Sequence, residues 1–107
     1  MEPLTRQMYR LDRERIDLAR EFKARPFGVH SPELQAALNQ LRAVHPGGKL
    51  ILVCTKAYRE WTLGQLRGDP PRTYLFEDLV FDSLERAEWA VFKLRWRILT
   101  GTDLTLE

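Results

Sequence analysis

Hydrophobic positions recur at helical spacing near the start of the chain, and they predict two helices. In residues 4–24 they form one narrow stripe in a segment that is otherwise dense in charge. A helix with so thin an apolar stripe is poorly stabilised alone, so we expect it to lie across another surface, of its own domain or of a partner. In residues 32–44 the helix start is clearer, because Ser31 is a good N-cap and Pro32 suits the first helical position.

The last predicted helix carries two apolar stripes. Asp82 or Ser83 can cap its start, and Gly101 ends it. The first stripe contains small and aliphatic residues (Leu84, Ala87, Val91, Leu94, Ile98), and the second contains mostly aromatic ones (Trp89, Phe92, Trp96, Leu99). A surface helix of a monomer needs only one apolar face. Either this helix packs between a sheet and the N-terminal helix, or its second stripe contacts another subunit.

Three shorter segments predict β-strands. Residues 49–55 contain a continuous apolar run preceded by two glycines, which predicts a strand buried on both faces. Residues 61–66 alternate in polarity and residues 73–81 are rich in aromatic and aliphatic side chains, so both predict strands. Residues 56–60 can instead form a helical turn. The expected fold is α+β, with two N-terminal helices, a small, mainly antiparallel sheet and a long C-terminal helix.

Length and charge limit what this fold can do. The 107 residues fit a single domain, in which residues 1–25 form a helix that can extend onto a partner and residues 26–107 form the core. The 17 basic and 15 acidic residues are interspersed and leave a net charge of +2. A chain with this net charge lacks the strong positive field of a typical nucleic-acid-binding protein, so we do not expect nucleic acid as the partner.

The sequence also indicates a compartment. No stretch of about 18 apolar residues is present, so we expect no membrane span. The first 15 residues are charged and lack the apolar region of a secretory signal. With one cysteine there is no intramolecular disulfide framework. We therefore expect a cytoplasmic protein.

Residues that could carry chemistry are few. His30 and His45 lie in turns, and neither has a second ligand at metal-binding spacing. Cys54 ends an apolar run, where cysteine usually behaves as a small buried hydrophobe. The adjacent Glu77 and Asp78 point to opposite faces of a strand, so they cannot act together on one substrate. We expect no catalytic, cofactor-binding or metal-binding residue in this chain.

Large aromatic residues point instead to an interface. Three tryptophans in 107 residues exceed what one small core usually needs, and tryptophan is among the residues that anchor protein interfaces. The predicted contact surface for a partner consists of Phe27, Trp61, Trp89, Phe92 and Trp96.

Several short motifs follow one another in a particular order within residues 25–98. They are Pro26-Phe27-Gly28, His30-Ser31-Pro32 followed by Leu34-Gln35, Gly48-Lys49 before a strand, Arg59-Glu60-Trp61, and Ala90-Val91-Phe92 in the closing helix. Their order and approximate spacing resemble those of the small (alpha) subunit of N,N-dimethylformamidase. None of these motifs is a catalytic signature.

The resemblance implies a non-catalytic small subunit of a hetero-oligomeric, metal-dependent amide hydrolase, which converts a formamide to an amine and formate. It implies that a large catalytic subunit holds a mononuclear iron and performs the hydrolysis, while the small subunit stabilises it. The identity of the amide stays open. Two alternatives remain from the residues themselves: a free-standing adaptor or nucleic-acid-binding module that uses the arginine-rich N-terminal helix, and a small thiol enzyme built on Cys54.

Overall fold

The computed structural model of the chain describes residues 11–43 and 47–105. This part of the chain contains three helices and one antiparallel sheet with the strand order β1-β2-β3. The elements are α1 (Ile16–Ala24), α2 (Pro32–Arg42), β1 (Leu50–Lys56), β2 (Glu60–Arg67), β3 (Arg72–Phe81) and α3 (Leu84–Thr100). The predicted α+β fold is confirmed.

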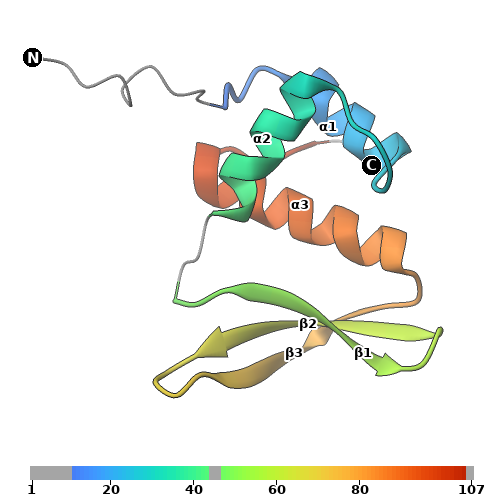
Figure 1. The fold of residues 1–107 in the computed structure, drawn as a ribbon, viewed down its shortest axis with the longest axis vertical. Helices are drawn as coiled ribbons and strands as arrows, with labels where there is room; N and C mark the ends of the chain where they lie inside the picture. The colour runs from blue at the N-terminus through green and yellow to red at the C-terminus, as the bar shows by residue number, and fades with distance from the viewer. Residues whose placement is uncertain (1–10, 44–46, 106–107) are drawn as a thin grey trace, which may run out of the picture.

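The elements form three layers, with α3 in the middle (Figure 1). α1 and α2 pack on one side of α3, and the sheet packs on the other. Phe92 and Trp96 of α3 join the hydrophobic cluster of the helices, whereas Val91 joins Leu50 and Leu63 of the sheet. Of the two alternatives for the double-striped helix, the first therefore holds, since α3 packs between a sheet and the N-terminal helices.

α1 begins later than predicted. The hydrophobic pattern predicts a helix over residues 4–24, but the described helix begins at Ile16, and residues 4–10 lie outside the described part of the chain. The Asp12 carboxylate accepts a hydrogen bond from the backbone N–H of Glu14 (2.8 Å). Such a local bond offers the backbone an alternative to the helix, so the chain turns here before α1 starts.

α2 starts as predicted. The Ser31 hydroxyl accepts a hydrogen bond from the Leu34 N–H (3.1 Å), which satisfies one of the free donors of the helix. The Glu21 carboxylate of α1 in turn accepts bonds from the Ser31 hydroxyl (2.6 Å) and backbone N–H (2.8 Å). The helix ends at Arg42, two residues before the predicted end of the 32–44 segment. Ser31 thus joins the two helices at one point.

β1 differs from its prediction. The apolar run in residues 49–55 predicts a strand buried on both faces, but β1 lies at the edge of the sheet. Its residues go from buried at Leu50 to exposed at Cys54. The reason is that α3 covers only one face of the sheet, and no other described element covers the opposite face. A single hydrogen-bonded turn, in which Arg59 N–H donates to the Lys56 carbonyl (3.0 Å), joins β1 to β2.

β2 and β3 confirm the two strands predicted over residues 61–66 and 73–81, but β3 contains a large bulge. Gly64 pairs with Leu75, and Thr62 pairs with Val80. Two residue steps along β2 therefore face five steps along β3. Bulges of this kind bend the strand and increase its twist.

α3 has both of its predicted caps. Ser83 is the N-cap, and its hydroxyl accepts a hydrogen bond from the Arg86 N–H (3.1 Å). At the other end Gly101 adopts a left-handed conformation with φ of 75°, and its N–H donates to the Arg97 carbonyl (2.8 Å). Glycine adopts this conformation without the steric penalty that a side chain brings.

Candidate functional site

A column of aromatic rings occupies the space between the helices. The ring of Phe92 stacks on that of Phe22 of α1, with centroids 4.5 Å apart. Trp89 and Trp96 flank Phe92 on α3 at centroid distances of 5.5 and 5.8 Å. Stacked aromatic pairs at these distances add to the stabilisation that burial alone provides. The column therefore belongs to the core that joins α1, α2 and α3.

This column corrects part of the predicted contact surface. Phe92 and Trp96 are 3% and 0% exposed within the chain itself, so their side chains are not on the surface. They are enclosed because α1 and α2 cover the second stripe of α3. The large size of these two residues is explained by the chain's own core, and we no longer assign them to a contact surface.

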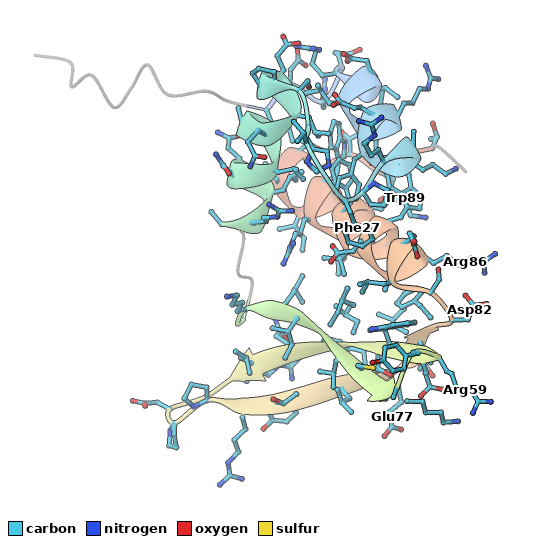
Figure 2. All side chains as sticks on the ribbon, turned by 45° about the vertical axis from the view of Figure 1, so that its right-hand side comes forward. Phe27, Arg59, Glu77, Asp82, Arg86 and Trp89 are labelled. Atoms are coloured by element: carbon cyan, nitrogen blue, oxygen red, sulfur yellow. The ribbon has the colours of Figure 1, made fainter. Side chains whose placement is uncertain are left out.

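The other three predicted contact residues are accessible to different degrees. Phe27, in the α1–α2 connection, is 44% exposed, and Trp61 of β2 is partly buried on the side of the sheet that faces α3. Trp89 is also partly buried, with the ammonium groups of Lys23 and Lys93 each 5.6 Å from its ring centroid. Figure 2 shows Phe27 and Trp89 in the helical part of the molecule. A partner contact for these three residues stays a prediction.

A second apolar surface lies on the side of the sheet away from α3, and we call it the outer face. It consists of two rows across the strands, Ile51–Gly64–Leu75 and Val53–Thr62–Val80. The side chains of Ile51 and Leu75 both approach the place where a Cβ on Gly64 would lie, at 3.5 and 3.3 Å. This contact shows that the two side chains meet over Gly64 on the same side of the sheet.

The outer face is exposed to solvent mainly along β3, whereas Thr62 at its centre is only 4% exposed. Leu75 is 42% and Val80 is 44% exposed, and Leu79 in the bulge of β3 is also exposed. Glu77 of the bulge points away from α3 on this side of the sheet (Figure 2). An apolar surface with a charged rim is typical of a protein–protein contact.

A cleft of about 640 Å³ opens between β1 and α3, and we call it the cationic cleft. Its apolar lining includes Leu50, Leu52 and Val91, and its charged lining is Arg42, Lys49, Arg95 and Glu88. Burial and the nearby charge of Arg42 lower the pKa of Arg95, while Glu88 raises it. The cleft therefore combines an apolar wall with an excess of positive charge.

The residues considered for catalysis are not assembled into a site. Cys54 is an exposed free thiol on β1, although the sequence indicates a buried hydrophobe. His30 lies near the start of α2, where its Nε2 is 3.0 Å from the Arg25 carbonyl, and His45 lies outside the described residues. Among the residues that the structure describes, no group of three or more His, Cys, Asp or Glu side chains could hold a metal ion.

The arginines of the N-terminal segment are partly neutralised. The guanidinium of Arg15 forms ion pairs with Asp17 (3.0 Å) and Glu33 (3.3 Å), and Arg13 lies 4.0 Å from Glu14. These contacts reduce the charge that the segment offers to phosphate groups. No helix in residues 11–43 or 47–105 is long and apolar enough to cross a membrane.

Sequence reasoning missed both the outer face and the cationic cleft. The outer face is exposed because α3 covers the opposite side of the sheet. No local sequence pattern predicts which side of a sheet a helix will cover. In the cleft, Arg42 comes from α2 and Arg95 from α3, so only the packing of these helices brings the two cations together.

A comparison with known proteins matches the chain to a protein family. The model of a protein family described as the N,N-dimethylformamidase alpha subunit matches residues 6–105. No curated protein matches the chain.

Proposed function

The chain belongs to the N,N-dimethylformamidase alpha-subunit family, and from this membership we propose that it is the non-catalytic small subunit of a metal-dependent amide hydrolase. In this proposal it binds and stabilises a large catalytic subunit that converts a formamide to an amine and formate. An alpha subunit implies a partner subunit, so binding is the part of the function that this chain's own residues perform.

The outer face is the observation that carries this proposal. It presents Leu75 and Val80 to solvent next to the partly buried Ile51 and Val53. Burying such side chains against a partner is favourable, by about 25 cal/mol for each Å² of apolar surface removed from water. A chain that worked alone would gain no stability from leaving these apolar side chains exposed. A subunit that buries them against a partner would gain binding energy, which fits membership of an alpha-subunit family.

The iron that the family resemblance assigns to the enzyme belongs, in this proposal, to the large subunit. The described residues of this chain do not fit a metal, since they contain no suitable group of ligands. In this proposal the large subunit performs the hydrolysis. We also propose a cytoplasmic location, which the unpaired and exposed Cys54 supports, because exposed thiols persist in reducing compartments.

The proposal is tested by binding to the dimethylformamidase large subunit of the same organism. The full chain, Val80→Asp and Val29→Asp are each mixed with the large subunit, and the dissociation constant is measured. Val29 is the matched control, because it is 86% exposed and lies in the α1–α2 connection rather than on the sheet. We expect Val80→Asp to weaken binding at least about tenfold, because it places a charge in an apolar contact, and Val29→Asp to leave it unchanged.

Two results would contradict the proposal. If the wild-type chain does not bind the large subunit at micromolar concentration, it is not the subunit that we propose. If Val80→Asp and Val29→Asp bind equally well while circular dichroism shows both to be folded, the outer face is not the contact.

A further inference from the structure

The cationic cleft contains an electrostatic imbalance that the chain does not resolve. Arg42, Lys49 and Arg95 line it together with a single carboxylate, Glu88. Among the described residues, none of these three cations has a carboxylate oxygen within 4.0 Å. Arginines elsewhere in the chain, such as Arg15, do form ion pairs with acidic neighbours.

Arg95 is the central residue of this cleft. Its side chain is half-buried, its Nη2 donates to the Leu50 carbonyl of β1 (3.3 Å), and its Nε is buried without a hydrogen-bond partner. Burying a charged group that lacks a partner is costly. Glu88 offsets the repulsion from Arg42, so burial of the guanidinium is the main reason that the pKa of Arg95 is lowered. An anion that bound this guanidinium would offset the cost of its burial.

We propose that the cationic cleft binds a carboxylate side chain of the large subunit, presented on a segment whose apolar residues rest on Leu50, Leu52 and Val91. This inference rests on the proposed function, because it names the chemistry of the partner's contact. The occupant follows from charge complementarity: three cations against one carboxylate leave room for a further negative charge. The fork of a guanidinium also suits a carboxylate, which it can bind with two hydrogen bonds.

The cleft fits an acidic protein segment better than a nucleic acid. Phosphate backbones are bound by extended stripes of cations, whereas these cations gather at one end of a cleft whose wall is apolar. The net charge of only +2 adds no long-range attraction for a polyanion.

The test measures how tightly two variants of the full chain bind the large subunit. The first, Arg42→Gln with Lys49→Gln, removes two exposed cations of the cleft and leaves the partly buried Arg95 in place. The control, Arg59→Gln, removes an exposed arginine beyond the opposite end of β1 (Figure 2). The dissociation constant is measured by titration calorimetry at low and at moderate salt.

We expect the double variant to raise the dissociation constant about tenfold and the control to change it less than about twofold, because only the former removes charge from a contact. The wild-type affinity should fall with added salt, and that of the double variant should fall less. If the double variant binds as well as the control, while the wild-type chain binds tightly, the cleft inference is wrong and the proposed function stands. If the wild-type chain does not bind the large subunit, both are wrong.

A single-stranded oligonucleotide is the second probe. We expect no binding to the wild-type chain at micromolar concentration and moderate salt. If the oligonucleotide binds, and binding is lost in Arg42→Gln with Lys49→Gln, the cleft is a phosphate site and the inference is overturned.

Discussion

Glu21 and Ser31 form the contact that joins the first two helices. The serine hydroxyl both donates to Glu21 and accepts from the Leu34 N–H, so one small side chain caps α2 and fixes the end of α1 against it. Ser83 caps α3 with the same geometry, at 3.1 Å from the Arg86 N–H, but no carboxylate among the described residues bonds to its hydroxyl. Comparison of the two serines therefore separates the stability that a helix cap contributes from the stability that the hydrogen bond to Glu21 adds.

Ser31→Ala should destabilise the chain more than Ser83→Ala. Loss of a helix cap costs about 0.5–2 kcal/mol, and at position 31 the Glu21 carboxylate also loses its hydroxyl donor. We expect the free energy of unfolding in urea to fall by about 1 kcal/mol in Ser83→Ala and by clearly more in Ser31→Ala. Equal losses would show that the bond to Glu21 contributes nothing.

The same contact makes stability depend on pH. Hydrogen bonds from the Ser31 hydroxyl and N–H hold the pKa of Glu21 below its ordinary value of 4.5. A carboxyl whose pKa is lowered by folding contributes stability above its unfolded pKa, and this contribution is lost as the pH falls through the folded pKa. Urea unfolding should therefore show Glu21→Gln to be less stable than wild type at neutral pH, with the difference shrinking below pH of about 4. A difference that is independent of pH would contradict this.

Arg95 should cost the isolated chain stability. Its half-buried guanidinium has no carboxylate partner among the described residues, and methionine can fill similar space without a charge. We expect Arg95→Met to raise the free energy of unfolding by up to about 1 kcal/mol, the low end of such replacements, because the group is only partly buried. The same variant should bind the large subunit more weakly. A less stable variant would show that the bond to Leu50 outweighs the cost of burial.

At the scale of elements, α3 supports both layers. One of its stripes packs on the sheet, and the other holds the aromatic column against α1 and α2. Trp96 is fully enclosed, whereas Trp89 is partly buried at the edge of the same cluster. The two tryptophans thus have the same chemistry and different surroundings.

Trp96→Ala should be far more damaging than Trp89→Ala. Removing a fully buried tryptophan leaves a cavity and costs about 3–5 kcal/mol, which can unfold a small domain. We expect a much smaller loss for Trp89→Ala, measured by thermal unfolding. Trp96→Phe, which keeps most of the packing, should remain folded if the alanine variant does not. If both alanine variants lose the same stability, Trp96 is not the centre of the helical core.

The elements also show how far the sequence could be interpreted. Ser31, Ser83 and Gly101 mark helix ends through local chemistry, and these predictions are confirmed. The predicted start of α1 was wrong. The Asp12 carboxylate accepts a hydrogen bond from backbone that the hydrophobic stripe had assigned to a helix. The prediction that β1 is buried on both faces was wrong, because an apolar run in the sequence does not show how many layers of structure cover the strand.

At the scale of the whole molecule, the contact surface was the hardest feature to predict. An excess of tryptophan indicated a partner, but Trp96 serves the chain's own core. The surface that remains open consists of smaller residues, including Leu75 and Val80, which are exposed because no described element covers that side of the sheet. Composition alone does not separate these two uses of apolar residues.

The central position of α3 has a consequence for cooperativity. Because the sheet and the helical layer rest on the same helix, loss of either should release the other, and we expect α2 and β2 amides to exchange with solvent at the same denaturant concentration. A ligand that binds only the native state stabilises all of it. The large subunit should therefore slow hydrogen exchange even in α1, which lines neither of the two surfaces that we propose for the contact.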